Sequence, residues 1–104
     1  MDIVEVTDAN YEQEVSSGFV IVDFWADWCM PCKMVAPVLE KYAKENEDVK
    51  IVKVNIDEAP DIVIEQSISS VPTFLFLKDG EVFDKKVGAI GEKDIDKIVS
   101  KMRK

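Results

Sequence analysis

Three apolar runs dominate the hydrophobic pattern of the chain, and none of them alternates regularly with polar residues. They cover residues 19–26 (FVIVDFWA), 49–56 (VKIVKVNI) and 73–77 (TFLFL). Runs of this length, rich in β-branched and aromatic residues, are typical of strands that are covered on both faces of a sheet. Residues 3–6 (IVEV) alternate apolar and acidic positions and predict a further, shorter strand.

Helical patterns occupy the segments between and after these strands. They cover residues 7–17, 32–46, 61–66 and 92–102. Thr7 or Asp8 is the expected N-cap of the first helix, which Gly18 ends. The second repeats apolar residues at helical spacing, namely Val35, Val38, Leu39 and Tyr42. Pro37 lies inside this helix and should kink it, because proline removes one backbone donor.

Asp79-Gly80 follows the third apolar run and is a strong hairpin signal. Residues 81–87 should therefore pair antiparallel with residues 73–77, whereas strands joined through helices pair parallel. The element order is βαβαβαββα. The sequence thus predicts an α/β fold with a central mixed five-stranded sheet flanked by four helices. No linker or repeat divides residues 1–104, which we expect to form a single domain.

Charge and length restrict the classes of partner. The chain has 104 residues and a net charge of −8, which argues against nucleic acid as a partner because phosphate binding needs local positive potential. No apolar run approaches the roughly 20 residues that span a membrane. The first residues, MDIVEV, do not resemble a signal peptide, so a cytoplasmic location is expected.

The chain has no histidine and only two cysteines, Cys29 and Cys32. The absence of histidine excludes the cysteine-histidine dyad of cysteine hydrolases and zinc sites built from both residue types. A four-cysteine zinc site would need a second chain. Any other metal site would need carboxylate ligands, and we predict no metal-ligating residues in the chain.

The spacing Cys29-Met30-Pro31-Cys32 favours a reversible dithiol over a structural crosslink, because closing so short a loop stabilises a protein little. The pair falls where a strand ends and a helix begins, and the unpaired N–H groups of a first helical turn favour a thiolate. Pro31 suits that turn because it lacks an N–H. We expect Cys29, next to Trp28, to be the exposed nucleophile and Cys32 to be more buried and to resolve the exchange.

Asp23 is a carboxylate within the apolar run 19–26. Burial without a partner would raise its pKa, and it could then exchange protons with a nearby thiol through water. Lys53, in the run 49–56, is a candidate partner. The alternative is that Asp23 lies on a sheet edge and is solvated.

Four segments resemble the thioredoxin family, and together they extend over the chain. DFWADWCMPCKMVAPVLE is similar to its active-site region, VKVNIDEAP to the strand after the kinked helix, SVPTFLFLKDGEV to the cis-proline loop and hairpin, and KVGAI to the segment before the last helix. The resemblance implies the thioredoxin fold and reduction of protein disulfides. It also implies recycling by a thioredoxin reductase and no bound cofactor, since the cysteines carry the two electrons.

The resemblance also assigns roles to individual residues. It implies that Cys29 attacks, Cys32 resolves, Asp23 takes the proton of the resolving cysteine and Lys53 pairs with Asp23. Pro72 matches the cis-proline, and Val71 before it offers its backbone to an extended substrate. The remaining positions around the dithiol and the docking surface are Trp25, Trp28, Met30, Pro31, Gly88 and Ala89. Disulfide-containing proteins are the implied substrates of a protein expected to be monomeric.

Met30 departs from the family pattern, which has glycine before the proline. It adds an apolar, flexible side chain beside the nucleophile, where it could alter the partners and the redox potential. Three other functions remain open: an oxidase or isomerase that donates its disulfide, a binding module in which the thiols are incidental, and zinc bridging between two chains. Retention of both cysteines together with Asp23 and Lys53 favours the reductase.

Overall fold

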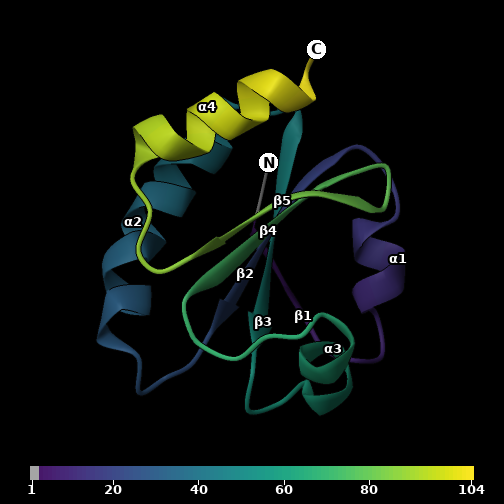
Figure 1. The fold of residues 1–104 in the computed structure, drawn as a ribbon. Coiled ribbons are helices and arrows are strands. Elements are labelled where there is room, and N and C mark those ends of the chain that lie inside the picture. The colour runs from purple at the N-terminus through teal and green to yellow at the C-terminus, as the bar shows by residue number, and fades with distance from the viewer. Residues whose placement is uncertain (1–2) are drawn as a thin grey trace.

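The computed structural model describes residues 3–104, so that Met1 and Asp2, which the signal-peptide argument used, lie outside the described residues. A five-stranded sheet runs through the centre in the order β1-β3-β2-β4-β5 (Figure 1). Its strands are β1 (Ile3–Val6), β2 (Phe19–Trp25), β3 (Val49–Asn55), β4 (Thr73–Lys78) and β5 (Glu81–Val87). β1, β3 and β2 are parallel, and β4 is antiparallel to both β2 and β5. The predicted mixed sheet is confirmed.

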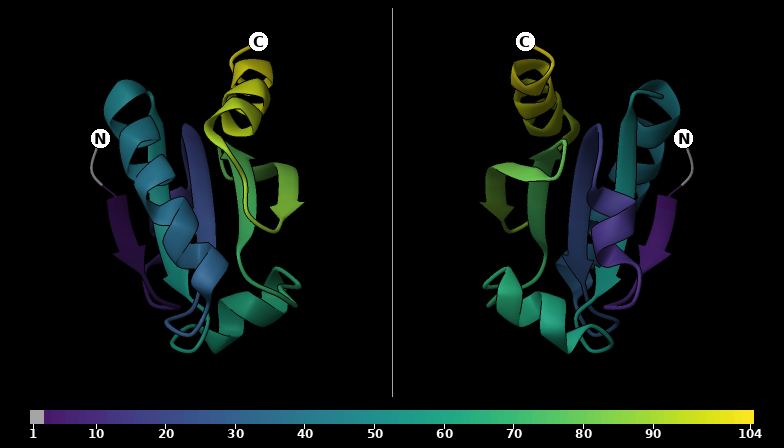
Figure 2. Two further views of the ribbon diagram at one scale, coloured as in Figure 1. Left: turned by 90° about the vertical axis from the view of Figure 1, so that its left-hand side faces the viewer. Right: turned by 90° about the vertical axis from the view of Figure 1, so that its right-hand side faces the viewer.

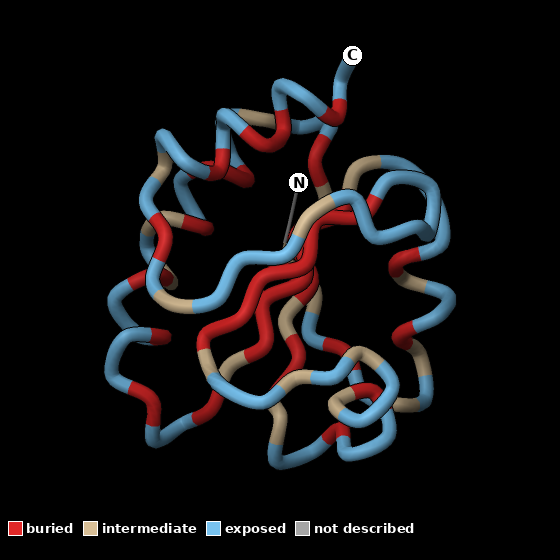
Figure 3. Tube along the Cα trace, in the orientation of Figure 1, coloured by how far each residue is buried: buried red, intermediate tan, exposed pale blue. Residues whose placement is uncertain are grey.

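Two helices pack on each face of the sheet. The helices are α1 (Tyr11–Val15), α2 (Met30–Glu45), α3 (Pro60–Glu65) and α4 (Glu92–Met102). The side views show α2 and α4 over one face and α1 and α3 over the other (Figure 2). Two apolar cores result, and the central strands contribute residues to both. Figure 3 shows these strands as the buried centre of the molecule.

β2 is the central strand, with β3 on one side and β4 on the other. Its residues alternate between the two cores, because successive side chains of a strand point to opposite faces. Val20, Val22 and Phe24 join the core under α1 and α3, whereas Ile21 joins the core under α2 and α4. Asp23 follows Ile21 on the second face, where α2 begins with the cysteine pair.

The first helix is shorter than predicted, because Thr7 and Asp8 do not cap it. Residues 7–10 form a turn in which the Thr7 N–H donates to Asn10 Oδ1 at 2.9 Å, and α1 begins only at Tyr11. Asp8 instead accepts hydrogen bonds from the backbone N–H groups of Asp61 at 3.3 Å and Ile62 at 3.0 Å. The carboxylate therefore caps α3, whose own N-cap residue makes no side-chain bond.

The hairpin between β4 and β5 has the predicted turn. Asp79 and Gly80 both have positive φ, 50° and 86°, which is the two-residue turn that Asp-Gly favours. The turn is tied to the loop between α1 and β2, because the Gly18 N–H donates to Asp79 Oδ1 at 2.8 Å and the Asp79 N–H donates to Gly18 O at 2.9 Å. A side chain at position 80 would meet the Ser16 carbonyl.

Candidate active site

The cysteine pair lies at the start of α2, directly beyond the end of β2. Helix α2 begins at Met30, two residues earlier than predicted, and Cys29 is its N-cap. Cys29 and Cys32 form a disulfide, with their Cα atoms 5.3 Å apart. The structure therefore shows the oxidised state of the predicted dithiol.

The first turn of α2 surrounds the sulfur of Cys29 with positive potential. Cys29 Sγ accepts a hydrogen bond from the backbone N–H of Cys32 at 3.2 Å. Pro31 occupies the first turn, where its missing N–H leaves no donor unpaired. A negative charge on Cys29 would be stabilised by this hydrogen bond and by the helix dipole, so the helix start favours Cys29 as the thiolate after reduction.

The expected difference in exposure between the two cysteines is wrong for this state. Cys29 is 4% exposed and Cys32 is 6% exposed. The two sulfurs face each other in the disulfide, and Trp25, Ile56 and Val71 pack against the cluster that they form with Ala26. In the oxidised state the two cysteines are therefore buried to a similar degree, and the expected difference in exposure is absent.

Exposed apolar side chains surround this buried disulfide. Trp28 is 67% exposed and Met30 is 66% exposed. Pro31, directly before Cys32, is also exposed. The indole N–H of Trp28 donates to Asp57 Oδ2 at 3.1 Å, which holds the ring while leaving it accessible. Met34, 73% exposed, was not predicted, although its position four residues after Met30 places both methionines on one helix face.

A second segment completes the surroundings of the disulfide. The Val71–Pro72 peptide bond is cis, as the resemblance implied, and Val71 packs against the cysteine cluster. Gly88 lies beside this segment, because its N–H donates to Pro72 O at 2.8 Å, and its φ of 96° suits glycine. The structure thus brings Val71, Pro72 and Gly88 together.

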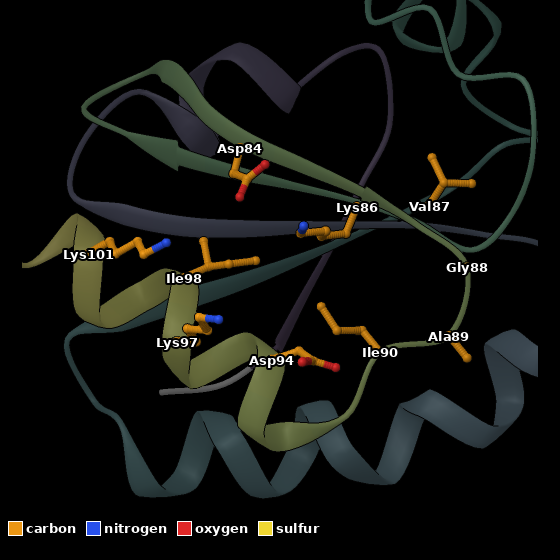
Figure 4. A pocket seen from close by; sticks show the side chains of 10 residues that line it. All are labelled: Asp84, Lys86, Val87, Gly88, Ala89, Ile90, Asp94, Lys97, Ile98 and Lys101. Atoms are coloured by element: carbon orange, nitrogen blue, oxygen red, sulfur yellow. The ribbon is translucent and has the colours of Figure 1, made fainter.

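Gly88 and Ala89 also form one end of a groove of about 360 Å³ between β5 and α4. Lys86, Lys97 and Lys101 extend into it, and Ile90 and Ile98 form its apolar part, while Val87 points away (Figure 4). Asp84 and Asp94 contribute negative charge to the same groove. The predicted docking residues therefore lie on two adjoining surfaces, one around the disulfide and one along α4.

Asp23 is buried, so the alternative that it lies solvated on an edge is wrong. It is 2% exposed on the central strand, and its Oδ1 atom has no hydrogen-bond partner. Burial raises the pKa of its carboxyl to about 7, with a smaller opposing effect from Lys53 and a further increase from Glu5. Asp23 can therefore gain and lose a proton near neutral pH.

Lys53 lies opposite Asp23 in the register of β2 and β3, but the two side chains form no ion pair among the contacts of residues 3–104. The ammonium lies instead over the ring of Trp25, 4.7 Å from its centroid. Direct pairing of Asp23 with Lys53 was therefore a wrong prediction for this structure. Lys53 acts on Asp23 at a distance, by lowering its pKa.

The comparison with known proteins agrees with this geometry. The sequence profile of the family described as Thioredoxin matches residues 2–104. The chain belongs to the thioredoxin family. It is 46% identical to a thioredoxin of Listeria monocytogenes over 95% of this chain and 97% of the relative. It is also 45% identical to a thioredoxin of Bacillus subtilis and 43% identical to one of Staphylococcus aureus, in both cases over 97% of this chain and 98% of the relative.

Membership of the thioredoxin family and the cysteine pair at the helix start establish the class of chemistry. The protein is a thiol-disulfide oxidoreductase that exchanges a dithiol for a disulfide. Thioredoxins in general act on disulfide-containing proteins and are recycled by a reductase. Within residues 3–104, no helix is long and apolar enough to cross a membrane. The same residues contain no cluster of cysteine and carboxylate ligands suited to a metal ion.

Proposed function

We propose that this member of the thioredoxin family reduces disulfides of partner proteins, with Cys29 as the nucleophile and Cys32 as the resolving thiol. The observation that supports these roles is the backbone N–H of Cys32 donating to Cys29 Sγ at the N-terminus of α2. A hydrogen bond and a helix dipole both stabilise negative charge on the N-terminal sulfur. Cys32 lies one helical turn further along α2 and is therefore not at the N-terminus of the helix.

The exchange has two steps. The Cys29 thiolate attacks one sulfur of the substrate disulfide, that disulfide breaks, and the other substrate sulfur leaves as a thiolate. Cys32 then loses its proton and attacks Cys29 Sγ, which releases the second substrate sulfur. The partner gains two electrons and two protons in all, and the protein is left with the Cys29–Cys32 disulfide seen in the structure.

Asp23 accepts the proton of Cys32 through water in the second step. A carboxyl with a pKa of about 7 suits this task, because the best general base has a pKa near the working pH. The face of β2 that carries Asp23 also carries Trp25, which packs against the buried cluster formed by Ala26, Cys29 and Cys32. Lys53 assists by its positive charge, which favours the ionised form of Asp23.

The substrate docks on the apolar surface around the disulfide. Its side chains contact Trp28, Met30 and Pro31, and its backbone pairs in extended form with Val71 ahead of Pro72. Gly88 lies beside Pro72, and Gly88 and Ala89 extend this surface into the adjoining groove along α4. We further propose that the protein acts as a monomeric single domain in the cytoplasm, without a bound cofactor, and that a thioredoxin reductase restores the dithiol.

A redox titration of the cysteine pair combined with an insulin-disulfide reduction assay tests the direction of electron flow. We expect turnover with dithiothreitol as the electron source and a strongly reducing potential. A potential of about −120 mV, typical of a strong periplasmic oxidant, would overturn the reductase function. Absence of turnover would do the same.

Two single variants test the roles of the cysteines. Cys32→Ser should accumulate a stable mixed disulfide with substrate, because the resolving thiol is missing. Cys29→Ser should form no such adduct and should have no measurable turnover. Equal trapping by the two variants, measured by non-reducing electrophoresis and mass spectrometry, would contradict the assignment.

A further inference from the structure

Three charged side chains occupy one row across three adjacent strands. Glu5 of β1 is the register partner of Lys53 of β3, and Lys53 is the register partner of Asp23 of β2. Register partners on neighbouring strands point to the same face of a sheet. This face is the one under α2, so the row runs from Glu5 at the sheet edge, through Lys53, to the buried Asp23.

Glu5 lies at the solvent end of this row. It lines a cavity of about 330 Å³ at the ends of β1 and β3, together with Trp25, Asp27 and Glu58 among others. Trp25 is also the ring over which the Lys53 ammonium lies. The cation therefore contacts a wall of the cavity that Glu5 borders.

Lys53 is shared electrostatically by two carboxylates. Its charge lowers the pKa of Asp23 and the pKa of Glu5, although burial is the largest influence on both and raises them. Glu5 in turn raises the pKa of Asp23. Neither carboxylate forms an ion pair with Lys53 within the described part of the chain, so the ammonium over the Trp25 ring acts on both of them at a distance.

We propose that Glu5 is a positioning residue of the exchange site, which determines through Lys53 how tightly Asp23 holds its proton. The Glu5 carboxylate attracts the ammonium toward the cavity and adds negative charge to the row, and both effects favour protonated Asp23. The consequence for catalysis rests on the proposed function, in which Asp23 accepts the proton of Cys32. Glu5 would then keep Asp23 an effective base at neutral pH rather than a weak one.

Few other charges face this row. Asp27 and Glu58, from the loops after β2 and β3, raise the pKa of Glu5. Helix α2 presents Cys32 and four other buried residues to the sheet side, namely Val35, Leu39, Tyr42 and Ala43. The Tyr42 hydroxyl among them donates to Asp96 at 3.0 Å. The buried residues of α4 are all apolar. Glu5 and Lys53 are therefore the charges that act on Asp23.

The direct test is a carbon-13 NMR titration of the Asp23 carboxyl in the full-length oxidised protein, where no thiol titrates beside it. Glu5→Gln should lower the titration midpoint by about half a pH unit, as expected for two charges two strands apart, roughly 10 Å. Lys53→Gln should raise it. Glu81→Gln, on the exposed strand β5, is the matched control for loss of one negative charge and should leave the midpoint unchanged.

A double variant tests whether Glu5 acts through Lys53. In Glu5→Gln/Lys53→Gln, the effect of the Glu5 substitution should be smaller than in the wild-type background. An unchanged midpoint in Glu5→Gln, or an equal shift in Glu81→Gln, would overturn the proposal, and so would full additivity in the double variant. All of these readings are independent of turnover.

The kinetic consequence is measured separately. The rate at which a preformed Cys29 mixed disulfide is resolved, followed from pH 5 to 9, should have its midpoint shifted to lower pH in Glu5→Gln, with a rate about two- to threefold higher at pH 6. If Asp23→Asn resolves the mixed disulfide with the wild-type pH profile, the proposed role of Asp23 fails. The NMR midpoints would still decide whether Glu5 controls the proton on Asp23.

Discussion

The two faces of the central strand β2 differ at neighbouring residues. Phe24 points into the core under α1 and α3 and is fully buried among apolar side chains. Asp23 points to the other face, is almost as buried, and has an oxygen without a hydrogen-bond partner. The face under α1 and α3 is apolar along the whole of β2, whereas the face under α2 and α4 changes from the apolar Ile21 to the carboxylate of Asp23.

This difference separates stability from chemistry. Apolar burial on the Phe24 face stabilises the fold at every pH, because it involves no proton. Burial of Asp23 destabilises the ionised form and thereby holds a proton acceptor near neutral pH. The protein therefore places its titratable group on one face of a strand and retains an uninterrupted core on the other.

Phe24→Ala should have the largest effect on stability and should leave the proton chemistry unchanged. Removal of a fully buried ring should lower the free energy of unfolding by about 3–5 kcal/mol. Urea denaturation of the oxidised protein measures this loss, and NMR titration checks that the Asp23 midpoint stays near 7. A shift of that midpoint would show that the two faces are coupled.

Asp23→Asn should have the opposite effect on stability and should raise the free energy of unfolding. The pKa of Asp23 is about 7 in the folded protein and near 3.8 when unfolded, so only the unfolded state loses the proton between these values. The contribution of Asp23 to stability therefore decreases as pH rises from about 4 to 7 and stays low above that. The asparagine variant should gain on the order of 2–4 kcal/mol above pH 7 and little at pH 4.

Urea denaturation at pH 4 and pH 8 measures this gain, with Asp27→Asn as the exposed control. Stabilisation that is equal at both pH values would show that the effect of Asp23 is not due to its charge. Resolution of mixed disulfides should slow in Asp23→Asn although the protein is more stable. If Asp23→Asn is more stable but resolves mixed disulfides as fast as the wild type, the face that carries Asp23 has no separate role in the chemistry.

Asp8→Ala should have a smaller effect, confined to the face of Phe24. Loss of the hydrogen bonds to the first turn of α3 should lower the free energy of unfolding by about 1 kcal/mol. Asp8→Asn retains an acceptor and is the matched control. Urea denaturation measures both variants, and a change in the redox potential of the cysteine pair would contradict the independence of the two faces.

Met30→Gly should have the smallest effect, and it should change substrate docking without changing stability. Met30 is exposed and uncharged, so we expect the KM for a protein disulfide to rise roughly two- to threefold through lost apolar contact. The rate with a small-molecule disulfide and the Asp23 midpoint should be unchanged. Steady-state kinetics with insulin and with a small-molecule disulfide measure the two effects. Equal effects on the two substrates would indicate that Met30 changes the redox potential of the cysteine pair and not the docking of the substrate.

Local patterns predicted most of the elements but not all of their ends. The bounds of β1, β5 and α4 agree with the prediction, because alternation, the Asp79-Gly80 turn and helical periodicity are each contained in a few neighbouring residues. The first helix was predicted too long. Aspartate is a good N-cap residue, so the sequence pattern assigned Asp8 to the helix that follows it. In the fold Asp8 caps α3 instead, which is more than 50 residues away along the chain.

The sequence by itself determined the order of the elements and the position of the cysteine pair at a helix start, whereas the burial of Asp23 was decided by the structure. These follow from hydrophobic runs, turn residues and spacing, all of which act over short distances along the chain. Only the tertiary structure decided that Lys53 lies over Trp25 instead of pairing with Asp23, and that Glu5 joins the same row. Strand register and the packing of distant side chains set these positions, because electrostatic effects depend on distance in space and not on separation in sequence.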